Sequence, residues 1–228
     1  MTRPYVICHM VTSIDGKVTG DFLYSSACEE ATELYYKINR GYRADAFGCG
    51  RITMEGSFTG GFYPELSKYE PCTDTGDYIA PRRRDFFAVA FDRLGRLGWR
   101  GPEIVDDDPG YGEAHIIEVL TNKADKRYLT YLRGMGISYI LVPESEYIVK
   151  ALEKLGTLFG IRTLLLEGGS VINGAFIRSG AVDEISTVVS PIVGDRDGLP
   201  LFDGATVTSY TLSTVEKVGG CVWIKYKK

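Results

Sequence analysis

A glutamate stands in an unusual place in the segment LLLEGGSVINGAF. Glu167 directly follows three leucines that predict a buried strand, and it directly precedes a glycine pair that opens a helical pattern. A carboxylate at the end of a buried strand is costly unless it is paired or solvated in a cleft. Ligands of α/β proteins bind at the carboxyl ends of strands, so Glu167 is a candidate catalytic or substrate-binding group.

The glycine pair after Glu167 predicts an anion site. Gly168 and Gly169 let a phosphate oxygen approach the backbone, and a helix that starts at Ser170 presents free N–H groups at its positive end. The spacing is not the GxGxxG of a Rossmann turn, so the dinucleotide fingerprint does not apply. A tight strand-to-helix turn without a ligand explains the same spacing equally well.

Two further strand ends carry polar groups. Asp15, in SIDGK, either converges with Glu167 on one pocket or makes an Asx turn before Gly16. The segment FGCGRITME again passes from strand through glycine to helix start, and there the Arg51 guanidinium is able to grip a phosphate bidentately. The GxGR pattern alone does not specify a ligand.

Alternating strands and helices must position these groups. Strand patterns cover residues 5–11, 44–49, 86–92, 115–121, 137–143, 163–167, 184–193 and 222–226. Helix patterns lie between them, at residues 26–41, 50–58, 124–133, 144–158 and 169–179. This alternation predicts an α/β fold with a mostly parallel central sheet, covered by helices on both faces, in a single domain over residues 1–228.

The composition favours a small-molecule partner. The 228 residues are 44% hydrophobic and 25% charged, with a net charge of -4. Without an excess of cations, neither nucleic acid nor a membrane surface is an expected partner. The five cysteines are odd in number and form no CxxC pair, which indicates reduced thiols and a cytoplasmic protein. We find neither a signal peptide nor a run of about 18 apolar residues.

Metal and histidine chemistry are not expected. His9 and His115 lie inside apolar runs, where a histidine is more often packed than catalytic. The acidic run Asp106–Asp108 beside Pro-Gly is typical of a hydrated loop. The zinc signature of nucleobase deaminases is absent from the sequence.

In this order, the three glycine-containing segments resemble the C-terminal reductase domain of the riboflavin biosynthesis deaminase-reductase and the stand-alone diaminohydroxyphosphoribosylaminopyrimidine reductases. The similarity covers nearly the whole chain and is most specific from LLLEGG to DGLPLF. It implies a dihydrofolate-reductase-like fold with three α/β/α layers, and a homodimer.

The resemblance also implies NADPH as cofactor. Gly169–Asn173 would wrap the pyrophosphate with Gly50, Arg51 and Thr53 on the other side, and the backbone near Val11 would meet the nicotinamide. Lys123 or Arg51 would meet a 2′-phosphate, which favours NADPH over NADH. The implied cofactor-binding residues are Val11, Gly50, Arg51, Thr53, Thr121, Asn122, Lys123, Gly168, Gly169, Ser170, Val171, Ile172 and Asn173.

For the substrate, the resemblance implies hydride transfer to C1′ of a ribosylamino-pyrimidine 5′-phosphate. The catalytic candidates are Asp15 and Glu167, and the substrate-binding candidates are Asp15, Ser25, Arg40 and Glu167. One departure stands out: the family's DDPxLTxR segment, whose arginine helps to bind the substrate phosphate, is replaced by MEGSFTGGFYPE. The residues Arg82–Arg84 are an alternative phosphate clamp, or else a solvated edge.

This departure keeps other functions open. One alternative is reduction of a pterin, a dihydrofolate-like compound or another heterocycle. Another is a non-catalytic nucleotide-binding protein of the same fold. A third treats every glycine turn as architecture alone.

Overall fold

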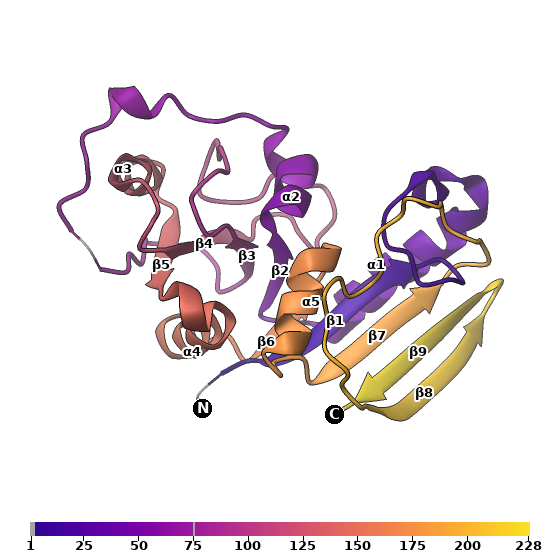
Figure 1. Cartoon of the computed structure of the whole chain (residues 1–228). Helices are drawn as coiled ribbons and strands as arrows, with labels where there is room; N and C mark the ends of the chain where they lie inside the picture. The colour runs from indigo at the N-terminus through magenta and orange to yellow at the C-terminus, as the bar shows by residue number, and fades with distance from the viewer. Residues whose placement is uncertain (1–2, 75) are drawn as a thin grey trace. The chain divides into compact units, whose positions relative to one another are not determined.

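The computed structural model describes residues 3–74 and 76–228, which form two compact units (Figure 1). Unit 1 holds Arg3, Pro4 and Asp45–Arg162, and unit 2 holds Tyr5–Ala44 and Thr163–Lys228. A single domain over residues 1–228 stays a prediction. Among the described residues, no helix has the length and apolar character to cross a membrane.

Unit 1 is built on four parallel strands in the order β5-β4-β3-β2. Helices α3 and α4 lie on opposite sides of these strands (Figure 1), as right-handed crossovers require when the chain reverses direction across a sheet. The strands are β2 (Ala46–Gly50), β3 (Phe87–Phe91), β4 (His115–Thr121) and β5 (Ser138–Val142), and the helices are α2 (Arg51–Met54), α3 (Lys126–Gly134) and α4 (Tyr147–Phe159).

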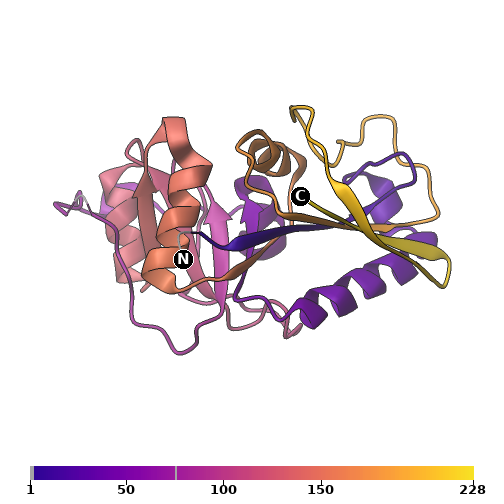
Figure 2. The same ribbon diagram turned by 90° about the horizontal axis from the view of Figure 1, so that it is seen from below.

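Unit 2 is built on five strands in the order β6-β1-β7-β9-β8. Strand β1 is parallel to β6 and β7, while β9 is antiparallel to β7 and β8. Helix α1 covers one face and α5 the other (Figure 2). The strands are β1 (Tyr5–Thr12), β6 (Thr163–Leu166), β7 (Glu184–Val189), β8 (Thr211–Val218) and β9 (Cys221–Lys227), and the helices are α1 (Glu29–Tyr42) and α5 (Ser170–Arg178).

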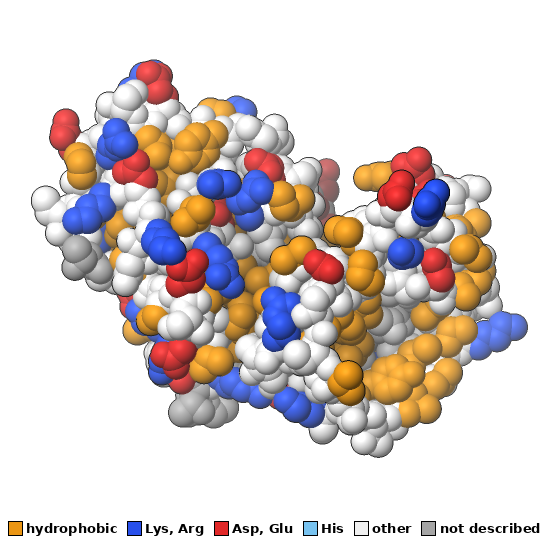
Figure 3. Space-filling model, viewed as in Figure 1, with side chains coloured by type: hydrophobic (Ala, Val, Ile, Leu, Met, Phe, Trp, Pro, Cys, Tyr) orange, Lys and Arg blue, Asp and Glu red, His pale blue; other side chains and the backbone are white. Residues whose placement is uncertain are grey.

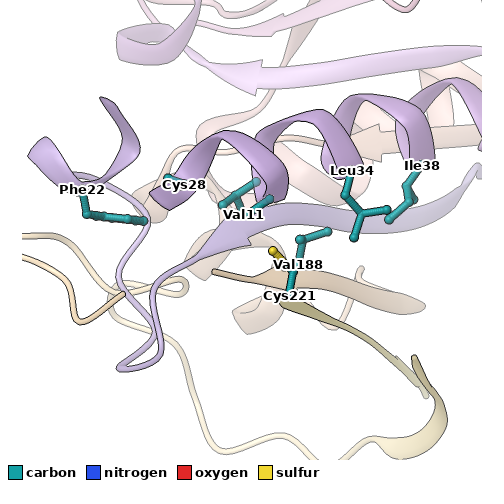
Figure 4. Packing of buried hydrophobic residues seen from close by; sticks show 8 residues of the cluster. Val11, Phe22, Cys28, Leu34, Ile38, Val188 and Cys221 are labelled. Carbon is teal, nitrogen blue, oxygen red and sulfur yellow. The ribbon is translucent and has the colours of Figure 1, made fainter. Parts of the chain in front are cut away.

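Helix α1 is anchored by an apolar stripe. Leu34 and Ile38, one turn apart, pack with Val11 of β1 and Val188 of β7 (Figure 4). This packing fixes the polar residues that share the buried face of α1.

Short helical turns lie in several of the connections between these elements. Helix α2 continues as a π-helical turn that ends at Gly60 in the left-handed region, with φ 61°. The turns are the 3₁₀ segments Asp21–Tyr24, Ser26–Cys28, Leu66–Lys68 and Glu144–Glu146, and the π-helical Glu55–Thr59.

The predicted alternation and the mostly parallel sheet are confirmed, and one strand was missed. Strand β8 carries the sequence TLSTVEKV, and its side chains are exposed or half-buried. An exposed strand of this kind lacks the apolar run by which buried strands are recognised. Figure 3 shows hydrophobic side chains gathered over β8 and β9, where Leu212 and Val215 are exposed.

Candidate functional site

Glu167 is buried at the carboxyl end of β6, with 6% of its surface exposed. The Asn39 side chain, at the end of α1, donates a hydrogen bond of 2.6 Å from Nδ2 to Oε1 of Glu167. This contact provides part of the pairing that a buried carboxylate needs. Glu167 is therefore a carboxylate fixed in orientation at a strand end, as a substrate-holding group must be.

Asn39 was missed by the sequence analysis. Its position is one helical turn beyond Tyr35 and two beyond Ala31, so it lies on the apolar face of α1, and it is only 5% exposed. A polar residue at a buried helical position was the available signal. Its partner lies 128 residues further along the chain, so the sequence pattern does not show the pair.

The Gly168–Gly169 turn has the backbone shape that the sequence predicts. Gly168 has φ +91°, and Gly169 is the N-cap of α5. No described side chain caps this helix, so its first N–H groups are available to an anion. Val171 is exposed and Ile172 half-buried at the start of α5.

Asn173 adds a second polar feature to this turn. Its side chain is fully buried and donates from Nδ2 to the carbonyl of Leu201 at 3.2 Å. Its Oδ1 lacks a hydrogen-bond partner within the described part of the chain. A buried, unpaired carbonyl oxygen is rare in a folded protein and fits a position that a ligand donor completes.

The segment after β7 braces α5 from outside. The Ser170 hydroxyl donates to the carbonyl of Pro200, and the Asp203 amide donates to Ser170 Oγ at 3.2 Å. From the first turn of unit 2, Lys17 Nζ donates to the carbonyl of Gly198 at 2.8 Å. These contacts come from the loop with the sequence GDRDGLPLF, which is the last part of the segment that most resembles the reductase family.

Asp15 connects the turn after β1 to the loop after β7. Its Oδ1 accepts hydrogen bonds from the Gly194 amide and the Ser13 hydroxyl, both at 2.7 Å. These two hydrogen bonds lower the pKa of the exposed Asp15 carboxyl, and the bond from the Gly194 amide has the larger effect. An Asx turn requires the Lys17 amide to donate to Asp15, but that amide donates to Ser13 Oγ at 2.8 Å. The Asx-turn alternative is therefore wrong, and the substrate role stays a prediction.

The remaining candidates of unit 2 lie on or near α1. Ser25 precedes the 3₁₀ turn that leads into α1, and its buried hydroxyl has no partner among residues 3–74 and 76–228. Arg40 is exposed in the last turn of α1. The Val11 side chain belongs to the core under α1, so only its backbone remains for a ligand.

In unit 1, the turn after β2 begins α2 as predicted. Gly50 is the N-cap, and Arg51 and Thr53 are half-buried in the helix. Arg51 Nη1 forms an ion pair with Glu55 Oε2 at 2.6 Å, one helical turn away. A phosphate would therefore share or replace this carboxylate as the partner of the guanidinium.

The segment after β4 has mixed exposure. Thr121 is buried and its hydroxyl donates to the carbonyl of Arg93 at 2.8 Å, whereas Asn122 and Lys123 are exposed. Lys123 forms an ion pair with Glu144, and both side chains remain at least half exposed. A pair so open to solvent contributes at most about 1 kcal/mol, so an incoming phosphate can displace it.

Two of the arginines proposed as an alternative clamp have carboxylate partners. Arg82 pairs with Asp85 and lies over the Phe87 ring, and Arg84 pairs with Glu113. Arg83 and Arg84 are exposed, as a solvated segment requires, but β3, which follows them, pairs with both β2 and β4 and is not an edge strand.

Both histidines serve packing. His9 is stacked on Tyr35, with Nδ1 3.0 Å from Ser186 Oγ and Nε2 3.1 Å from the carbonyl of Tyr35. Burial lowers the pKa of His9 to about 4. His115 is buried beside Ser138, and burial and the charge of Arg82 lower its pKa to about 4 as well. Both are neutral near pH 7.

A second buried carboxylate lies in unit 1. Oε1 of Glu118 accepts hydrogen bonds from the Trp99 indole and, at 3.1 Å, from the Tyr128 hydroxyl, while Oε2 has no partner among the described residues. Complete burial, and after it the charge of Asp92, raise the pKa of Glu118 well above its ordinary value. Burial therefore favours the protonated form of Glu118.

This raised pKa predicts how stability depends on pH. Below the ordinary glutamate pKa of about 4.3, Glu118 is protonated in both the folded and the unfolded protein, and its contribution to stability is fully present. That contribution is lost as the pH rises toward the raised pKa of Glu118 in the folded protein. The variant Glu118→Gln does not titrate. The free energy of unfolding of the variant minus that of the wild type should therefore increase with pH above pH 5, by up to about 1.4 kcal/mol per pH unit. Urea unfolding between pH 5 and 8 measures this difference. A difference that is constant with pH would contradict a neutral Glu118.

The comparisons with known proteins show the family of this chain. Residues 109–223 match the model of the RibD C-terminal domain. A relative from Methanothermobacter thermautotrophicus, named 2,5-diamino-6-ribosylamino-4(3H)-pyrimidinone 5′-phosphate reductase, is 46% identical over 206 residues, covering 89% of this chain and 85% of the relative. A protein of the same name from Aquifex aeolicus is 32% identical over 212 residues, covering 90% of this chain and 84% of the relative.

The fold also matches a solved structure. A pyrimidine reductase-like protein from Corynebacterium diphtheriae superposes with a TM-score of 0.69 at 18% identity, covering 98% of this chain and 91% of that one. This similarity confirms the dihydrofolate-reductase-like fold. With the matched family model and two relatives more than 30% identical over most of their length, this chain belongs to the RibD C-terminal domain family of riboflavin-pathway reductases.

Proposed function

We propose that this chain is an NADPH-dependent reductase of riboflavin biosynthesis, which converts the ribosylamino group of a pyrimidine 5′-phosphate to a ribitylamino group. Two electrons and one hydrogen pass to C1′ of the opened ribose, and a proton from water completes the reduced C–N unit. The reduced nicotinamide, when bound, supplies the hydride and leaves oxidised. Binding and orienting the two reactants fall to the residues of the chain.

One observation carries the proposal: a buried, hydrogen-bonded carboxylate directly precedes a helix start whose N–H groups are uncapped by any described side chain. Glu167 provides a fixed acceptor for hydroxyl or ring N–H groups of a substrate. The adjoining N–H groups suit phosphate oxygens. These are the two needs of a reductase that holds a polar substrate beside a dinucleotide.

The residues of α5 fit the cofactor. In this proposal the backbone from Gly168 to Ile172 binds pyrophosphate oxygens, and the unpaired Oδ1 of Asn173 accepts from a cofactor donor. For Gly50, Arg51, Thr53 and Thr121–Lys123 of unit 1, a cofactor role is proposed separately, from their place at the ends of β2 and β4. The backbone at Val11 accepts or donates toward the nicotinamide amide.

On the substrate side, Glu167 and Asp15 orient the pyrimidine or the opening ribose. Arg40 takes the phosphate in place of the missing family arginine, which its exposure on α1 allows. The Ser25 hydroxyl, unpaired among the described residues, is a further hydrogen-bonding group for the substrate. Positioning of this kind supplies most of the rate in a hydride transfer that needs no metal.

The proposal is tested by supplying purified protein with NADPH and the ribosylamino-pyrimidinone 5′-phosphate. We expect cofactor oxidation and a product heavier by two hydrogens. Oxidation with dihydrofolate but not with this substrate would favour a pterin reductase. Tight NADPH binding without oxidation by either compound would favour a non-catalytic nucleotide-binding protein.

The choice of NADPH over NADH rests on the cations. Replacing Lys123 with Ala should raise the KM for NADPH about tenfold, because a charge-assisted contact to the 2′-phosphate is lost, and should leave the KM for NADH unchanged. The matched control is Lys126→Ala, an exposed lysine at the start of α3. Equal changes for both cofactors would contradict a role of Lys123 at the 2′-phosphate; Arg51→Ala then tests the other candidate.

We also propose a homodimer and a cytoplasmic location. The exposed apolar side chains on β8 support an interface between copies, and the mass of the protein in solution tests it. No disulfide joins any of the five cysteines, all of which lie in the described residues, and this supports a reducing compartment.

A further inference from the structure

We propose that Asn39 is a positioning residue, whose side-chain amide fixes the carboxylate of Glu167 in the orientation that binds the substrate. This inference rests on the proposed function and adds a residue to it. The contact is a hydrogen bond of 2.6 Å between two side chains that are 5% and 6% exposed. A bond so short and so buried restricts the rotation of the carboxylate.

The amide is held rigidly at its own end. Asn39 follows Ile38, which packs into the core beneath α1, and the helix ends three residues later at Tyr42. Arg43 then adopts the left-handed conformation, with φ 46°, which closes the helix. Because α1 is anchored on both β1 and β7, Asn39 cannot follow Glu167 if the carboxylate turns away.

The amide also favours the ionised form of Glu167. Burial disfavours a carboxylate, and a donor at hydrogen-bond distance offsets that cost. From β1, the titratable group that faces Glu167 is the thiol of Cys8, whose pKa is raised by burial and by the charge of Glu167. A neutral thiol does not neutralise the carboxylate, whereas the Asn39 amide donates to it at 2.6 Å.

The decisive variant is Asn39→Leu, which removes the donor and keeps a similar volume. We expect the Glu167 titration to move to higher pH, since a hydrogen bond to the charged form is lost. The titration is followed directly by ¹³C NMR of protein labelled at glutamate carboxyls, with Glu167→Gln to assign the resonance. In turnover, the acidic limb of the kcat/KM profile should move to higher pH by the same amount, and kcat should fall roughly ten- to a hundredfold.

Two further variants separate positioning from folding. Ile38→Ala destabilises the same helix by truncating its core, and should lower Tm without moving the Glu167 titration or the acidic limb. The exchanged pair Asn39→Asp with Glu167→Gln keeps one amide and one carboxylate in contact. This double variant should fold but show no substantial turnover, because the carboxylate then lies at position 39 in α1 and no longer at position 167 after β6.

The outcomes are distinct. A Glu167 titration in folded Asn39→Leu that matches the wild type would overturn the inference, as would an unmoved acidic limb in an active variant. Full activity of the exchanged pair would overturn it too. If the wild type reduces no substrate while the Asn39→Leu titration still shifts, the proposed function fails and the electrostatic support of Glu167 by Asn39 stands.

Discussion

Replacing Glu167 with Gln is expected to lower kcat by roughly a hundredfold or more while the protein stays folded. The amide has nearly the same size as the carboxylate, and its carbonyl oxygen still accepts the hydrogen bond from Asn39. What the variant loses is the negative charge and one acceptor toward the substrate. When positioning supplies most of the rate, a misplaced substrate costs about this much. Cofactor oxidation with the ribosylamino-pyrimidinone phosphate measures the effect.

The matched control for this prediction is Glu184→Gln. Glu184 is also a buried carboxylate of unit 2, 4% exposed, and it accepts hydrogen bonds from Tyr42 and Tyr5. Its replacement should lower stability and leave kcat within about twofold of the wild type, an estimate for a change that only affects surrounding structure. NADPH affinity should be unchanged in both variants. Full turnover in Glu167→Gln would contradict a role of the Glu167 carboxylate in orienting the substrate.

The position of Glu167 could be predicted because it breaks a pattern. Strands buried on both faces appear as unbroken apolar runs, and LLL is such a run at β6. A charge at the end of that run is costly wherever it folds, so the sequence alone marks it as functional or paired. The same reasoning explains why the fully buried β3 and β4 were predicted within one residue of their bounds.

Residues that depend on a distant partner could not be predicted in this way. Asn39 is one amide in a helix, and only the fold brings it to Glu167. The sequence showed Arg51 and Lys123 as cations close after strands, whereas the structure shows that each of them forms an ion pair with a glutamate. Charge is visible in a sequence, but the state of pairing is not.

Gly174 in α5 shows how closely the candidate cofactor helix is packed. A Cβ added at Gly174 would lie 1.8 Å from the carbonyl oxygen of Asp203 and 2.8 Å from its carbonyl carbon. Both atoms are backbone, so the contact cannot be relieved by rotating a side chain. Asp203 also donates its amide to Ser170 at the start of the same helix, so any shift of this segment is transmitted to the Gly-Gly turn.

We therefore expect Gly174→Ala to lower the free energy of unfolding by about 2 kcal/mol or more, since overpacking against backbone outweighs the gain in helix propensity. NADPH affinity should fall with it, because Ser170 and Asn173 lose their bracing. The matched control is Gly41→Ala in α1, where an added Cβ meets no described atom within 4 Å and the same substitution should stabilise by about 0.5–1 kcal/mol. Urea unfolding and cofactor titration of the two variants measure both effects. A Gly174→Ala protein as stable as Gly41→Ala would show that the segment at Asp203 yields freely, and that α5 is not held by it.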